Sequence, residues 1–224
     1  MLGLRPDFVL STYGGGFDAQ TGFATREELL TVGANTYVPA STCGGPNDLA
    51  LQNAQTIDDS YALLRDLGVI FDVSDRAEAI IAESQRQIAE VAAKVAGQPA
   101  ARVMVVIPGM EMGSGDFSSI AANGIWNDII AKAGGVNAFA GTTDGLFANL
   151  SREQVAATPV DAVVIVSFMN PTPEADAERL FAAFPQWEAA KRDRFVVLSD
   201  SIYLGPSNAI AVDRIARMIH PDAV

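Results

Sequence analysis

The sequence predicts an α/β fold in which two Rossmann-like lobes with parallel sheets are joined by a single long helix. Short apolar strands alternate with amphipathic helical segments along the chain, as in βαβ units. Two of the strands, at 102–107 and 161–168, are almost wholly apolar, which is typical of strands buried on both faces of a parallel sheet. One long amphipathic segment lies between such regions. We therefore expect an N-terminal lobe at 1–73, a bridging helix at 74–97 and a C-terminal lobe at 98–224.

The segment from Ser74 to Gly97 has the features of a complete helix. Ser74 or Asp75 can cap its start, because a short side-chain oxygen satisfies backbone N–H groups there. Gly97 can end it in the left-handed conformation, and Pro99 prevents its continuation. At 1.5 Å per residue the helix is roughly 33 Å long, about the width of a small domain. Its predicted buried stripe, with three- and four-residue spacing, contains Ala77, Ile80, Ile81, Ser84, Ile88, Val91, Ala92 and Val95.

The remaining elements are short. Before the long helix, strands are predicted at 7–11, 36–38 and 69–73, and helices at 26–32, after a capping box of Thr25 and Glu28, and at 57–67, ended by Gly68. After it, strands are predicted at 102–107, 161–168 and 195–198, and helices at 125–133, 151–157, 173–183, 186–191 and 206–219. The segments 39–55 and 108–119 are predicted to be loops.

The composition limits the partners of this chain. With 224 residues, 49% of them hydrophobic, it can bury a sizeable core, and its formal net charge of −12 disfavours nucleic acid and anionic membranes. The single cysteine, Cys43, excludes an internal disulfide. The chain has no run of 18 apolar residues and no export signal, and it begins almost directly in a strand. We therefore expect an incomplete N-terminal lobe, with any signal segment upstream.

Catalytic and cofactor motifs are sparse. His220 is the only histidine and lies near the C-terminus, as a helix-end cation or a surface residue, and Cys43 has no evident base partner. The glycine run at 14–16 lacks the spacing of nucleotide-binding loops, and no HExxH or Cys/His cluster is present. The sequence therefore predicts no catalytic residue, no cofactor and no metal site built by the protein.

A ligand site is predicted at the carboxyl ends of the strands, where parallel sheets bind their ligands. The loops there combine aromatic, methionine and polar side chains, which suit a large, partly apolar ligand. The alternative is that these aromatics only close the core, and that Met110 and Met112 fill gaps and ligate no haem iron. The candidate ligand-binding residues are Tyr13, Gly14, Gly15, Phe17, Tyr37, Met110, Glu111, Met112, Phe168, Asn170 and Tyr203.

Glu153 is a candidate contact for a protein partner. It follows Ser151 at the start of a short helix, on an expected exposed corner. The simple interpretation is a carboxylate favoured by the helix dipole. The functional interpretation is an acidic contact for an arginine pocket on a partner.

Several segments together resemble the substrate-binding proteins of ABC importers for ferric siderophores, haem and cobalamin. The matching segments are LRPDFVLS (4–11), LGVIFDVSDRAEAIIAE (67–83), IWNDIIAKAGGVNAF (125–139), SREQVAATPVDAVVIVS (151–167) and AAKRDRFVVLSDSIYLGPS (189–207).

This resemblance implies a periplasmic or extracytoplasmic binding protein that meets the membrane only through its permease, with a lipid anchor on the full-length precursor as an option. The ligand would lie in a cleft between two lobes joined by a rigid helix, and a glutamate on each lobe would dock onto the permease. By the SREQV match, the C-terminal glutamate is Glu153, whereas its N-terminal partner would precede LRPDFVL. We expect a ferric siderophore as ligand, with haem or cobalamin as alternatives. A small-molecule enzyme on a doubly wound fold is the alternative from another class.

Overall fold

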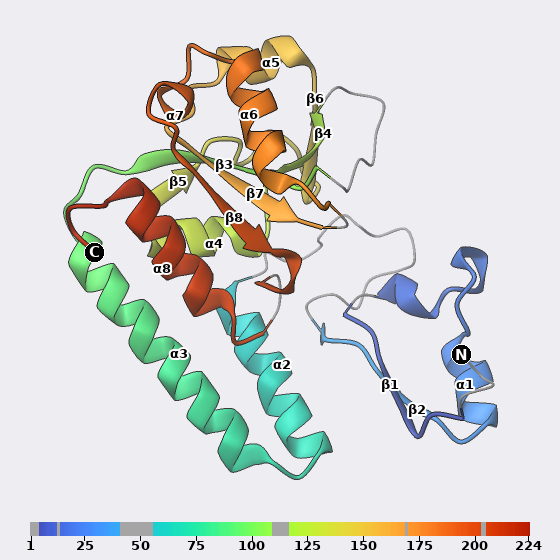
Figure 1. Cartoon of the computed structure of the whole chain (residues 1–224). Coiled ribbons are helices and arrows are strands. Elements are labelled where there is room, and N and C mark those ends of the chain that lie inside the picture. Colours follow the sequence, from blue (N-terminus) through green and yellow to red (C-terminus); the bar gives the residue numbers. More distant parts are fainter. Residues whose placement is uncertain (1–4, 13, 41–55, 109–116, 169, 203–204) are drawn as a thin grey trace. The chain divides into compact units, whose positions relative to one another are not determined.

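The computed structural model describes residues 5–12, 14–40, 56–108, 117–168, 170–202 and 205–224 (Figure 1). The chain forms two compact units, residues 1–55 and residues 56–224. The predicted long helix belongs to the second unit, which has an α/β fold. The arrangement of two lobes joined by this helix stays a prediction.

A mixed sheet forms the centre of the second unit. Its strands are β3 (Ala101–Val106), β4 (Phe117–Ala121), β5 (Gly135–Asn137), β6 (Phe147–Leu150), β7 (Ala162–Ser167) and β8 (Phe195–Ser199). They follow the order β6-β4-β3-β7-β8, and β5 pairs with the first half of β3. β3, β5, β7 and β8 are parallel, but β4 runs antiparallel to both β3 and β6. The prediction of an all-parallel sheet is therefore corrected to a mixed one.

Alternate residues of the central strands face two separate cores. Val103 and Val105 of β3 pack with helices on one face, whereas Met104 and Val106 pack with helices on the other. Side chains of a strand alternate between its two faces. A strand buried on both faces is therefore apolar at successive positions, as the sequence of β3 indicated. The first core involves α2 (Ile57–Ile70), α3 (Ser74–Val95), α4 (Ile125–Lys132) and α8 (Asn208–Ile219). The second involves α5 (Arg152–Ala157), α6 (Pro173–Ala183) and α7 (Glu188–Lys191).

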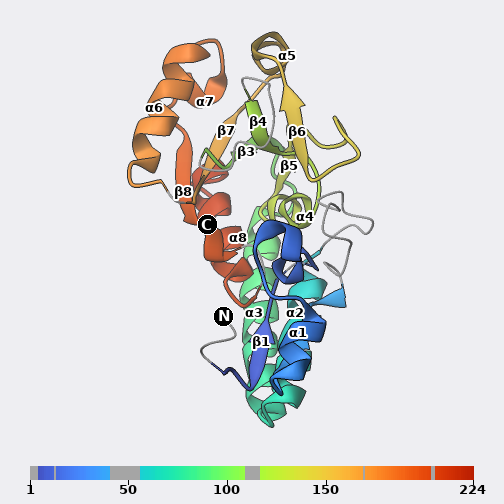
Figure 2. The ribbon, with the colours of Figure 1, turned by 90° about the vertical axis from the view of Figure 1, so that its right-hand side faces the viewer.

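The long helix α3 buries the stripe that its sequence predicts. Six of the eight predicted residues are buried, and Ile80 and Ala92 are partly buried. The stripe packs on α8 and on α2, which lies beside α3 in both views (Figures 1 and 2). Between α2 and α3 the Tyr61 hydroxyl and Ser84 Oγ are 3.2 Å apart in a buried hydrogen bond. The helix begins at Ser74 after Val73 without a side-chain cap, contrary to prediction, and Gly97 adopts the expected left-handed conformation (φ +81°).

The segment before α3 differs from the prediction. Gly68 does not end α2, which continues to Ile70, and residues 71–73 form a turn instead of a strand. A Cβ at Gly68 would lie 2.8 Å from Ala77 Cβ and 3.2 Å from Ser74 Cα. Glycine is therefore required here because the two helices approach closely, and it remains inside the helix.

The first unit is small. β1 (Phe8–Leu10) and β2 (Asn35–Tyr37) form a parallel pair, and α1 (Arg26–Thr31) lies between them in sequence. Its buried core consists, among the described residues, of Phe17, Leu29 and Ala34. The capping box before α1 is confirmed: Glu28 N donates to Thr25 Oγ1 (3.1 Å), and Thr25 N donates to Glu28 Oε2 (2.9 Å).

The other predicted helices and strands are confirmed within two residues. Three strands were missed, because β4, β5 and β6 are short and contain polar or small residues. β4 contains Ser118 and Ser119, both buried, in a segment predicted as the end of a loop.

Candidate ligand-binding edge

The carboxyl ends of three parallel strands meet at one edge of the sheet in the second unit. Val106 of β3 is paired with Ile165 of β7, and Ser167 of β7 with Ser199 of β8. The chain therefore leaves the three strands side by side. We call residues 107–108, 168, 170–172 and 199–202 the carboxyl edge, because ligands of parallel sheets bind at such positions.

Two of the predicted ligand residues lie on this edge. Phe168 is partly buried and packs against the core beneath the sheet, and Asn170 is partly buried in the following turn. Tyr13, Met110, Glu111, Met112 and Tyr203 lie outside the described residues.

The turn after β7 is held by hydrogen bonds of Asn170. Its Oδ1 accepts from Thr172 N (2.9 Å), and its carbonyl oxygen accepts from Ser167 Oγ (3.4 Å). Its Nδ2 donates to the carboxylate of Asp176, which also forms an ion pair with Arg179. Both ends of the Asn170 amide are thus engaged by the protein.

The end of β8 presents a group of hydroxyls that the sequence prediction did not include. Ser199 Oγ accepts hydrogen bonds from the amide and hydroxyl of Ser201 (3.2 and 2.9 Å) and donates to Asp200 Oδ1 (3.2 Å). Ser199 and Asp200 are exposed, and Ser167 is the strand partner of Ser199. The signal in the sequence was the polar triplet directly after the predicted strand at 195–198.

In the first unit, the described candidate residues lie at the end of β2 or shortly after β1 in sequence. Leu10 and Tyr37 are paired, and Ser11 N donates to Tyr37 O (3.1 Å). Gly14 and Gly15 belong to a 3₁₀ turn (η2, Gly14–Phe17) after β1.

Phe17 fills the core of the first unit. Its side chain is 8% exposed, and it packs with Leu29 and Ala34. In this structure Phe17 therefore fits the alternative interpretation, in which an aromatic residue only closes the core.

Glu153 lies on a well-anchored surface helix. It is the second residue of α5 and is exposed. The helix is capped by Ser151 and Gln154, and Val155 is fully buried. Arg152 Nη2 donates to Ala183 O (3.4 Å), and the guanidinium carbon lies 5.4 Å from the centre of the Phe184 ring. The protein therefore holds the Glu153 backbone in a defined position.

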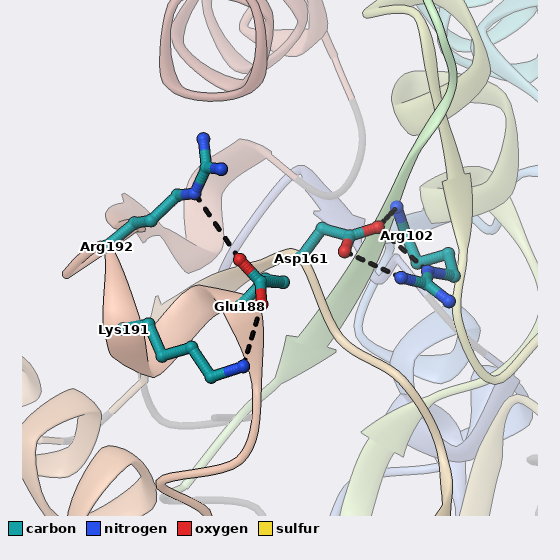
Figure 3. A network of polar contacts seen from close by, with 5 residues as sticks. All are labelled: Arg102, Asp161, Glu188, Lys191 and Arg192. Carbon is teal, nitrogen blue, oxygen red and sulfur yellow. Dashed lines mark hydrogen bonds and ion pairs between the residues drawn. The ribbon is translucent and has the colours of Figure 1, made fainter.

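A polar network lies at the opposite, amino end of the strands (Figure 3). Asp161 accepts from Arg102 Nε, Arg102 Nη2 and Arg102 N, all at 2.8 Å. These hydrogen bonds lower the pKa of Asp161. In the same view, Glu188 pairs with Lys191 (2.8 Å) and Arg192 (3.5 Å), and the hydrogen bond from Lys191 lowers the pKa of Glu188.

A cavity of about 260 Å³ adjoins this network. Its lining includes Arg102, Gln186 and Glu188 and none of the predicted site residues. Arg102 is bonded to Asp161, Gln186 to Ala156 O and Glu188 to Lys191. These polar groups are therefore engaged in hydrogen bonds within the protein.

His220 has a structural role. It is buried at the end of α8, and its Nε2 lies 3.1 Å from Gly134 O, so the alternative of a surface residue is wrong. Within the described ranges, no three His, Cys, Asp or Glu side chains are grouped so that they could hold a metal ion. Likewise, none of the described helices is long and apolar enough to cross a membrane.

In a comparison with protein families, residues 1–201 match the family described as periplasmic binding protein. Comparison with curated proteins gives no match.

Among solved structures, a periplasmic binding protein from Veillonella parvula has a TM-score of 0.81 at 22% identity, covering 100% of this chain and 73% of that one. An ABC-type Fe³⁺-hydroxamate transport system protein from Saccharomonospora viridis has a TM-score of 0.73 at 23% identity, covering 98% and 70%. A periplasmic heme binding protein from Pseudomonas aeruginosa has a TM-score of 0.73 at 22% identity, covering 100% and 75%. At these identities the similarity shows a shared fold.

Proposed function

Because the chain belongs to the periplasmic binding protein family, whose members bind and do not catalyse, we propose that it is the substrate-binding component of an ABC importer with a ferric siderophore as its ligand. The family match over 1–201 carries the proposal. The similar fold of a protein named for Fe³⁺-hydroxamate transport supports the ligand class. In this proposal the chain works outside the cytoplasm, in the periplasm or its equivalent.

The carboxyl edge supports binding of a large chelate. It combines the partly buried ring of Phe168 with exposed polar groups of Ser199 and Asp200. Such a mixture suits a ligand with apolar surface and several hydrogen-bonding oxygens. Residues of the first unit at the end of its sheet, including Tyr37, are proposed as further contacts.

Charge and iron chemistry favour a hydroxamate. Three hydroxamates neutralise a ferric ion, whereas three catecholates give a trianion, which a chain of net charge −12 disfavours. A hexadentate siderophore fills the octahedral coordination of the iron with its own oxygens and needs no ligand atom from the protein.

Haem is the second candidate, because the similar structure from Pseudomonas aeruginosa is named for heme binding. His220, the only histidine of the chain, is buried against Gly134 O. A haem iron would therefore need a ligand other than histidine, such as a tyrosine oxygen or a methionine sulfur.

The proposal is tested by isothermal titration calorimetry of the purified chain with ferrioxamine B, ferric enterobactin, haemin and cyanocobalamin. Iron-free desferrioxamine B is the matched control. We expect ferrioxamine B to bind with a Kd of about 1 μM or lower, and at least about tenfold more tightly than ferric enterobactin or the control. Haemin binding with a shifted Soret band, without ferrioxamine binding, would favour the second candidate. No binding of any of the four would contradict the proposed function.

The partner in this proposal is the permease of the importer, and Glu153 is the proposed docking residue on this chain. Its exposure on the anchored helix α5 leaves the carboxylate available to an arginine of the permease.

A further inference from the structure

A buried carboxylate holds the turn after β7 in place. Asp176 is the fourth residue of α6, and its side chain is only 9% exposed. It accepts a hydrogen bond from Nδ2 of Asn170, six residues earlier. Asn170 in turn accepts from Thr172 N (2.9 Å), so the helix, the amide side chain and the turn backbone form one connected chain of hydrogen bonds.

Asp176 lies in the first turn of α6, where the helix dipole favours an acid, but this does not explain why the carboxylate is buried. Burying a carboxylate is costly, and an apolar residue on the buried face of α6 would avoid that cost. The ion pair of Asp176 with Arg179 offsets little, because the Arg179 side chain is 71% exposed and water screens the attraction. Among the described residues, the carboxylate also contacts Asn170, and the effect of this contact is to hold the turn.

The fixed turn lies on the carboxyl edge. It begins at Ser167, the strand partner of Ser199, and contains Phe168, which packs on the core beneath. Ser167 Oγ also donates to Asn170 O (3.4 Å), which ties the turn to the end of the strand. Ser167 and Asn170 lie on either side of Phe168 in the chain, so their hydrogen bond and the contacts of Asn170 with Asp176 and Thr172 bear on the position of Phe168.

We propose that Asp176 is a positioning residue for ligand binding: through Asn170 it fixes the turn after β7 and so presents Phe168 preorganised to the ligand. This inference rests on the proposed function, because it assigns the turn to the ligand site. In this role the side-chain amide of Asn170 is bonded to Asp176 and Thr172 N and does not itself bind the ligand. A preorganised turn strengthens binding because less conformational freedom is lost when the ligand arrives.

The test compares Asp176→Ala, Asn170→Ala, their double variant and Asp176→Asn, with Arg179→Ala as the matched control. Arg179→Ala removes the exposed ion pair but keeps the hydrogen bond between Asp176 and Asn170. Two readouts are measured: the Kd of ferrioxamine B, and the hydrogen exchange rate of the Thr172 amide, which reports on the turn without any ligand. Circular dichroism checks that each variant is folded, and Asn170→Ala tests the same contact if Asp176→Ala does not fold.

We expect each alanine variant at 170 or 176 to weaken ferrioxamine binding about tenfold and to accelerate Thr172 exchange at least about tenfold. The double variant should bind no more weakly than Asn170→Ala, because that change already removes the contact with Asp176. Asp176→Asn keeps an acceptor oxygen and should restore most of the binding, and Arg179→Ala should change Kd less than about twofold.

Unchanged Thr172 exchange, multiplicative losses in the double variant, or faster exchange with unchanged Kd would each overturn the positioning role. If the wild-type chain does not bind ferrioxamine B, the proposed ligand fails. The exchange data then still decide whether Asp176 fixes the turn.

Discussion

At Gly134 both the backbone conformation and the close packing favour glycine. Its φ is +84°, and an added Cβ would lie 2.8 Å from His220 Nε2 and 3.0 Å from Val95 Cγ2. Strain in the left-handed region and overpacking both add to the cost, so we expect Gly134→Ala to lower the free energy of unfolding by about 2–4 kcal/mol. Gly97→Ala is the matched control, because Gly97 has φ +81° with no atom within 4 Å of an added Cβ. Its cost should be about 1–2 kcal/mol in urea unfolding. Equal losses at the two positions would disprove the packing argument.

Asp161 links stability to pH. Its hydrogen bonds with Arg102 lower its folded-state pKa, so below about pH 4 the unfolded chain binds a proton more readily than the folded one. The contribution is therefore complete above the unfolded pKa and is lost as the pH falls through the lowered folded pKa.

We expect Asp161→Asn to cost about 1 kcal/mol at pH 7, a modest value because the Arg102 side chain is 45% exposed. Urea unfolding at pH 7 and at pH 3 checks this. The difference between wild type and variant should shrink at the lower pH, and a difference that grows there would show that the assigned sign is wrong.

Among the elements, the pair α2 and α3 depends on one close approach, at Gly68. Alanine is favoured over glycine within a helix by about 1 kcal/mol, but its Cβ at position 68 would lie 2.8 Å from Ala77 Cβ. We expect the clash to prevail, so that Gly68→Ala destabilises the protein by about 1–2 kcal/mol net.

The second-site change Ala77→Gly removes one of the clashing atoms. The double variant Gly68→Ala/Ala77→Gly should therefore lose less stability than the sum of the two single changes, as measured by urea unfolding. Simple additivity would place the cause of the Gly68 requirement elsewhere.

Elements that carry a local pattern were predictable. The stripe of α3, the capping box at Thr25, the cap at Ser151 and the apolar runs of β3 and β7 each depend on residues a few positions apart. β4, by contrast, contains two serines and becomes a strand only because β3 and β6 lie on either side of it. Its antiparallel direction follows from pairing across the sheet, which periodicity does not encode.

For the whole molecule, the two units differ greatly in their cores. Two apolar clusters, composed entirely of residues from 56–224, fill both faces of the large sheet. The first unit has a two-stranded sheet and three described buried core residues, a combination that is marginal at best in isolation.

We therefore expect a fragment of residues 56–224 to unfold cooperatively within a few degrees of the full chain, and a fragment of residues 1–55 to be unfolded on its own. Differential scanning calorimetry and circular dichroism would show this. Non-cooperative melting of the larger fragment would mean that the first unit is required for its stability.

The docking role proposed for Glu153 is tested on the intact protein in cells. We expect Glu153→Ala to reduce uptake of ferrioxamine B by cells about tenfold or more, with the Kd for the ligand unchanged. The matched control is Glu27→Ala, since Glu27 is also an exposed second residue of a short helix with a capping box, preceded by arginine. Equal loss of uptake in both variants, or weaker ligand binding in the Glu153 variant, would argue against a docking role.

The sequence by itself determined the α/β class, the extent and buried stripe of α3, the N-terminal caps of α1 and α5, and the apolar strands. These features depend on local spacing and on short-range hydrogen bonds. Only the tertiary structure decided the direction of β4, the continuation of α2 through Gly68, the burial of Phe17 and the contact between Asp176 and Asn170. Each of these depends on which segments pack together. Strand pairing, a close approach of two helices and the burial of a side chain are set by contacts that the local sequence pattern does not specify.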